Sequence, residues 1–194
     1  MMKTPEAAYE ELVQRVKNIA LLGNTASVLH WDMETYMPSA GAEYRSQQLS
    51  LLSGMLHEQF TTPEIGDLLT CVEQSDLVKD PLSDCAVNVR EIRREYDREV
   101  KVPKSLVEEL ARVTSLAHVV WREARKNSDY KAFQPTLENV VRLTLEKADA
   151  IATGPTRYDT LLDGYEPGMT TDRMKAVFTA LGNELNPFVE EILS

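Results

Sequence analysis

The sequence predicts an all-α protein with about seven helices in a bundle. Apolar residues recur at three- and four-residue steps along nearly the whole chain of 194 residues, whereas strand-like alternation is rare. Thr-Pro, Asp-Pro and Asn-Pro pairs also recur, and a capping residue followed by proline is typical of a helix start. No linker-like composition divides the chain, so we expect residues 1–194 to form a single helical domain.

The first three helices are predicted from their prolines. Pro5 follows a capping threonine, and the helix that it opens should reach Thr35, because Pro38 cannot continue it. A second helix is expected over residues 40–60. Pro63 should open a third helix, whose predicted buried stripe is Ile65, Leu68, Leu69 and Val72.

Three further helices are predicted in the middle of the chain. Asp80 should cap the fourth helix, with Pro81 at its first position. Pro103 should open the fifth. Asp129 can cap a short turn, after which Pro135 should start the sixth helix.

The C-terminal part combines a loop with two helix starts. Residues 153–169 form the long irregular segment of the prediction, and loops of this length in a helical domain are usually functional or structured by something beyond themselves. Thr170 or Thr171 should cap a seventh helix. Asn186 and Pro187 repeat the cap-plus-proline pattern, so a further helix of about two turns is expected there. This suggests a piece of something larger, and the alternative is a short helix docked on the bundle.

The charge balance argues against two classes of partner. The chain carries 21 basic and 31 acidic residues, a net charge of −10, so neither nucleic acid nor an anionic membrane surface is an expected partner. No apolar run approaches the roughly 18 residues of a membrane helix, and the start lacks a secretory signal pattern. The two cysteines, Cys71 and Cys85, are too far apart for a redox motif. A cytoplasmic location is the default expectation.

The histidines do not form a recognisable zinc site. His57 and Glu58 begin an H-E-x-x-H pattern, but Thr61 stands where the second histidine would be. His118 has no acidic or histidine partner one turn away, and we expect it at the surface or at the edge of the core. Signatures of serine, cysteine and nucleotide-binding enzymes are also missing. We therefore predict no catalytic, cofactor-binding or metal-binding residue in the chain.

The segment HWDMET contains the most informative histidine. His30 and Glu34 are one turn apart and share a helix face, so they could contribute to a metal site if other helices supplied further ligands. The favoured interpretation is structural: a hydrogen-bond network at the helix end, with Trp31 packed in the core.

Four segments resemble one known family. They are LHWDMETYMP (29–38), GAEYRSQQLSLLSGMLHEQFT (41–61), VREIRREYDREVKVP (89–103) and YDTLLDGYEPGMT (158–170). In sequence, order and spacing they resemble the thermostable zinc carboxypeptidases typified by carboxypeptidase Taq. The resemblance covers essentially the whole chain, but family members are considerably longer. It implies that their zinc ligands, an H-E-x-x-H helix and a downstream glutamate, lie in a C-terminal part that has no counterpart here.

The resemblance implies a role beside a peptide-binding cleft. The family's N-terminal helices form part of the wall or lid of a deep substrate cleft, so we expect this chain to be such a portion, without zinc of its own and with peptide substrate only in a full-length context. The alternative is a stand-alone interaction or dimerisation module. The residues expected to face the cleft are His30, Trp31, Asp32, Glu34, Asp163, Tyr165, Glu166 and Met169.

A homodimer is also expected. The terminal apolar stripe cannot bury a full face alone, and monomers rarely leave large apolar patches bare. The residues of this stripe are Phe188, Val189, Ile192 and Leu193.

Overall fold

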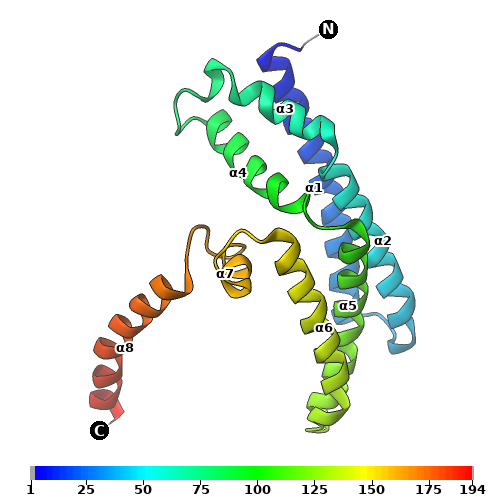
Figure 1. The fold of residues 1–194 in the computed structure, drawn as a ribbon. Helices are drawn as coiled ribbons and strands as arrows, with labels where there is room; N and C mark the ends of the chain where they lie inside the picture. The colour runs from blue at the N-terminus through cyan, green and yellow to red at the C-terminus, as the bar shows by residue number, and fades with distance from the viewer. Residues whose placement is uncertain (1–2, 194) are drawn as a thin grey trace. The chain divides into compact units, whose positions relative to one another are not determined.

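The computed structural model describes residues 3–193 and confirms the all-α prediction. This part of the chain folds into eight α-helices and two short 3₁₀-helices and contains no strand (Figure 1). It divides into two compact units, Met1–Thr144 and Leu145–Ser194, and each is described by itself. The expectation of a single domain stays a prediction.

Five complete helices and the beginning of a sixth belong to the first unit. They are α1 (Pro5–Thr35), α2 (Ala42–Phe60), α3 (Pro63–Glu73), α4 (Asp84–Glu99), α5 (Lys104–Lys126) and the first two thirds of α6 (Tyr130–Ile151). The 3₁₀-helices η1 (Ser39–Gly41) and η2 (Asp76–Val78) lie in the connections between them. The second unit holds the end of α6, then α7 (Arg157–Leu162) and α8 (Thr171–Leu193).

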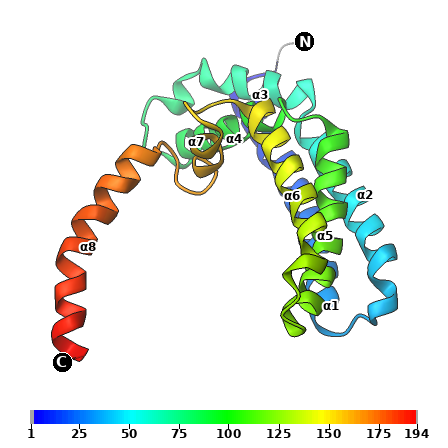
Figure 2. The same cartoon turned by 60° about the horizontal axis from the view of Figure 1, so that its bottom comes forward.

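The core of the first unit forms where α1, α3 and α4 meet. Helix α1 packs against α2 along one part of its length and against α3 along another, and α5 packs against α2 (Figures 1 and 2). All four residues of the predicted α3 stripe are buried, which confirms that prediction. Burying such side chains stabilises the fold by roughly 1.5–3 kcal/mol each. The buried cluster consists of Ala8, Leu12, Ile65, Leu68, Leu69, Val72 and Val89.

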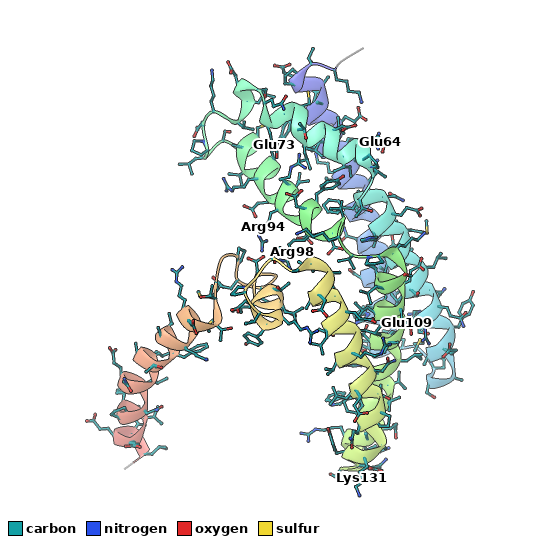
Figure 3. The ribbon with its side chains drawn as sticks, in the orientation of Figure 1. Glu64, Glu73, Arg94, Arg98, Glu109 and Lys131 are labelled. Carbon is teal, nitrogen blue, oxygen red and sulfur yellow. The ribbon has the colours of Figure 1, made fainter. Side chains whose placement is uncertain are left out.

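Charged side chains tie α3 to α4 at the edge of this core. Glu73, labelled in Figure 3, accepts hydrogen bonds of 2.8 and 2.9 Å from the guanidinium of Arg93. The Arg93 guanidinium also lies 5.7 Å from the ring centre of Tyr96. Hydrogen bonding to Glu73, above all, raises the pKa of Arg93 above its ordinary value.

The predicted start of the fourth helix is wrong by three residues. Asp80 does not cap a helix, because its side chain accepts the backbone N–H of Leu82 (3.0 Å) and closes a turn instead. Ser83 is the actual cap of α4, and its hydroxyl accepts the N–H of Ala86 (3.2 Å). Pro103, by contrast, directly precedes α5 as expected.

Two prolines that were expected to open helices lie inside them. Helix α6 begins at Tyr130, with the Asp129 carboxylate accepting the N–H of Ala132 (3.1 Å), and Pro135 follows within the helix. Helix α8 likewise continues through Pro187, so the separate terminal helix predicted there is wrong. An internal proline removes one backbone hydrogen bond, which these helices tolerate.

The predicted irregular segment 153–169 contains a short helix. The Thr156 hydroxyl accepts the N–H of Asp159 (3.0 Å) and caps α7. Thr170 precedes α8 and accepts the N–H of Arg173 (3.3 Å), which confirms the predicted start of that helix. Within residues 3–193 no helix is long and apolar enough to cross a membrane.

Candidate functional site

The HWDMET segment lies at the C-terminal end of α1, where Asp32 pairs with α2. The Arg45 guanidinium donates a 2.6 Å hydrogen bond to the Asp32 carboxylate and a second bond to the backbone carbonyl of Leu29. Its Nε donates to Gln48 (3.0 Å). The Arg45 side chain is only 13% exposed, so the guanidinium is largely shielded from water, whereas the Asp32 carboxylate is 34% exposed. The ion pair joins the last turn of α1 to α2.

Glu34 makes the corresponding connection to α5. One carboxylate oxygen lies 2.9 Å from Nδ1 of His118, and the other accepts a 3.0 Å hydrogen bond from Arg122. All three side chains are between 34% and 49% exposed. These three residues together with Asp32 and Arg45 are termed the α1-end cluster below. Both of its carboxylates are paired with cationic or imidazole groups, so the cluster fixes helix positions.

Exposed aromatic rings surround the α1-end cluster. Trp31 is 57% exposed, so the expectation that it packs in the core is wrong. Its ring meets the edge of Tyr36 at a centroid distance of 5.4 Å. On α5, the half-exposed Trp121 lies 5.6 Å from the ring of His118. Flat, partly exposed rings of this kind can contact apolar side chains of a peptide.

His30 belongs to a separate feature, a small hollow lined by residues of α1, α2 and α5. The hollow has a volume of about 270 Å³. His30 is exposed at its edge. Apart from Leu49, the other lining residues are small or carry hydroxyl groups: Ala26, Ser27, Ser53, Ala111, Thr114 and Ser115.

Residues 3–193 contain no set of ligands for the zinc ion that the family resemblance implies. No group of three or more histidine, cysteine or acidic residues in this range is arranged to hold a metal ion. His57 is buried, and its Nδ1 lies 3.2 Å from a carboxylate oxygen of Glu99. His118 contacts Glu34, as described above. The residues present therefore do not fit a zinc centre.

The second segment that was expected to face the cleft, residues 163–169, forms a closed loop in the second unit. The Asp163 carboxylate accepts the N–H of Gly168 (2.9 Å), and the carbonyl of Glu166 accepts the N–H of Met169 (3.0 Å). Gly168 has a φ of 75°, a value that favours glycine. Tyr165 is 89% exposed. Whether this loop and the HWDMET segment face one cleft stays a prediction, because they belong to different units.

Asp159 organises the base of that loop, and sequence reasoning missed it. This residue is 4% exposed, and its carboxylate accepts hydrogen bonds from the hydroxyl of Thr156 (2.5 Å) and from the N–H (2.6 Å) and hydroxyl (2.7 Å) of Thr171. The Thr156 hydroxyl, followed by the two Thr171 donors, holds the pKa of Asp159 below its ordinary value. The carboxylate thus ties α7 to the first residue of α8.

Several known proteins with related sequences and folds are named carboxypeptidases. The thermostable carboxypeptidase 1 of Thermus thermophilus is 41% identical over 199 residues, which cover 98% of this chain and 39% of that protein. The solved structure "BsuCP Crystal Structure" superposes with a TM-score of 0.86 at 26% identity, over 96% of this chain and 37% of that chain. The solved carboxypeptidase of Pyrococcus furiosus gives a TM-score of 0.76 at 29% identity, with the same coverage.

These matches show which family the chain belongs to and how much of its relatives' length the chain covers. The chain spans less than two fifths of the length of these relatives. The family described as carboxypeptidase Taq (M32) metallopeptidase matches residues 11–194, almost the whole chain. The chain therefore belongs to the carboxypeptidase Taq (M32) metallopeptidase family.

Proposed function

We propose that the chain is the helical, cleft-lining portion of a zinc-dependent carboxypeptidase that releases C-terminal amino acids from peptides. One observation supports this most: nearly the whole chain superposes on a solved relative with a TM-score of 0.86, yet it covers only 37% of that relative. Because residues 3–193 hold no set of metal ligands, the remaining part of the fold would bind the metal and carry out the chemistry.

In this proposal the α1-end cluster positions a binding surface. The ion pairs of Asp32 and Glu34 hold the end of α1 against α2 and α5. Trp31 and Tyr36 then present partly exposed rings at the helix end. Such rings would contact the side chains of a bound peptide, while the paired carboxylates keep their positions.

A second candidate function is a stand-alone helical module that pairs with itself. The apolar face of α8 favours it, since residues such as Phe178 and Ile192 are more than 60% exposed. The homodimer belongs to this candidate as a proposal, and such a module would need no catalytic residues.

A chimera separates the two candidates. The segment of the Thermus thermophilus relative that aligns with this chain is replaced by the present sequence, and release of C-terminal amino acids is measured. A cleft-lining portion gives an active chimera, whereas a self-pairing module gives an inactive one. Within the chimera, Trp31→Ala should raise KM with little change in kcat, since the ring only contacts substrate. The control Leu82→Ala, at a residue that is 84% exposed in a turn of the first unit, should change neither constant.

A further inference from the structure

Helix α8 carries an apolar seam that its own unit leaves open. Six apolar residues follow one another at alternating steps of four and three residues, and five of them are between 46% and 66% exposed. The seam consists of Met174, Phe178, Leu181, Leu185, Phe188 and Ile192. Within the second unit α8 contacts α7, at the end held by Asp159, and then extends away from it (Figures 1 and 3). Isolated proteins rarely leave an apolar surface of this extent uncovered.

The spacing of the seam indicates what kind of element covers it. Alternating steps of four and three residues are the pattern with which one helix packs its side chains between those of another. A helical partner crossing at about 20° would keep contact along the whole seam. The seam continues across Pro187 without a change of phase, so a single partner helix could follow both halves of α8.

The charges beside the seam argue against a second copy of α8 as that partner. Glu184 and Glu191 lie beside its C-terminal half, whereas Lys175 lies beside its beginning. In an antiparallel pair centred on the middle of the seam the two Glu184 side chains come together, and Lys175 of each helix is opposite Val189 of the other, so it does not offset this repulsion. In a parallel pair the acidic ends would meet. Like charges beside a helix seam oppose pairing, so a helix with basic residues opposite these glutamates fits better.

We propose that this seam docks a helix from the part of the carboxypeptidase fold that the chain does not span. This inference rests on the proposed function. The relatives supply the candidate partner, because more than three fifths of their length lies outside the region that matches this chain. Docking would cover the seam and connect the cleft-lining helices to the part that holds the metal.

Co-expression tests the docking directly. The chain carries an affinity tag, and the part of the Thermus thermophilus relative outside the aligned region is co-expressed as a separate polypeptide. We expect the two to purify together in equal amounts. Leu185→Asp places a charge in the middle of the seam and should abolish co-purification, while leaving the helical circular dichroism of the chain unchanged, because this side chain is 46% exposed. The matched control Leu82→Asp alters an exposed leucine outside α8 and should leave the complex intact.

Three results would overturn the docking proposal: no complex, a complex that tolerates Leu185→Asp, or a chain that instead forms a dimer dependent on Leu185. The same substitution in the chimera is a second measurement, and an unchanged melting temperature there would also count against docking. An active chimera that tolerates Leu185→Asp would refute the docking and leave the proposed function standing. An inactive chimera together with a complex sensitive to Leu185→Asp would refute the function and leave the docking standing.

Discussion

Arg45→Ala should destabilise the first unit more than any exposed ion pair can. The guanidinium is 13% exposed and makes three hydrogen bonds, to Asp32, Leu29 and Gln48. Hydrogen bonds that involve a charged group contribute about 1.5–3 kcal/mol each, but the bonds of one side chain are not additive. Asp32 is 34% exposed, so water partly compensates its carboxylate after the loss. We expect the free energy of unfolding to fall by about 2–4 kcal/mol.

Tryptophan fluorescence during urea denaturation measures this loss selectively. Both tryptophans, Trp31 and Trp121, lie in the first unit, so the signal reports the unfolding of that unit. Arg45→Lys keeps the charge but loses the fork-shaped pairing, and its effect should be intermediate.

The control is Arg90→Ala, because Arg90 and Glu91 are both 55% exposed; Arg90 also donates to the backbone carbonyl of Pro81 (3.2 Å). This pair should contribute at most about 1 kcal/mol. If Arg45→Ala changed stability no more than the control, the ion pair would not hold the end of α1, and the structural role of the α1-end cluster would be refuted.

Three further predictions concern the second unit and the core. Because the pKa of Asp159 is lowered in the fold, its stabilising effect is complete above the unfolded value of about 3.9 and is lost progressively as the pH falls from there through the lower folded value. The protection of the Thr171 amide, its exchange rate relative to the intrinsic rate at the same pH, should therefore decrease as the pH falls below about 4, and an unchanged protection would contradict this. Gly154→Ala should lower the melting temperature, because the new Cβ would lie 2.7 Å from the backbone nitrogen of Thr160. Gly182→Ala should raise it slightly, because the nearest neighbour of the new Cβ lies at 3.8 Å and alanine favours a helix. Equal shifts would refute the steric argument. Leu69→Ala, at a fully buried site, should cost about 2–5 kcal/mol in urea denaturation, and a loss of the size seen for exposed residues would place Leu69 outside the core.

Local sequence patterns predicted the helices well but several of their starts poorly. Pro5, Pro63 and Pro103 stand at or just before observed helix starts, because a fixed φ suits the first turn. Pro135 and Pro187 follow similar local patterns but lie inside helices. The difference depends on whether the preceding residues are already helical, which a cap-plus-proline pair does not encode.

The connections of the candidate site could not be predicted from the sequence. HWDMET drew attention to Asp32 and Glu34, yet their partners Arg45 and Arg122 lie on other helices. Finding them requires the rotation of α1 relative to α2 and α5, which helical periodicity does not give. Asp159 was missed because its interactions span a loop, from Thr156 to Thr171.

The exposure of Trp31 and of the α8 seam has a related origin. Periodicity identifies an apolar face but not the element that covers it. Trp31 was expected in the core, but it is 57% exposed. The two apolar stretches of α8 were assigned to separate helices, although one continuous helix presents both on a single seam. In our proposals the Trp31 ring contacts a bound peptide, and the α8 seam meets a part of the fold that lies outside this chain.

The specificity constant of the chimera with the Thermus thermophilus relative tests the central claim most directly. If the chain is the cleft-lining portion, the chimera should bind its metal fully and retain kcat/KM for a peptide substrate within about tenfold of the parent, a loss of at most about 1.4 kcal/mol of transition-state stabilisation. A chimera that folds and binds the metal fully, yet loses more than about a thousandfold in kcat/KM, would contradict the account.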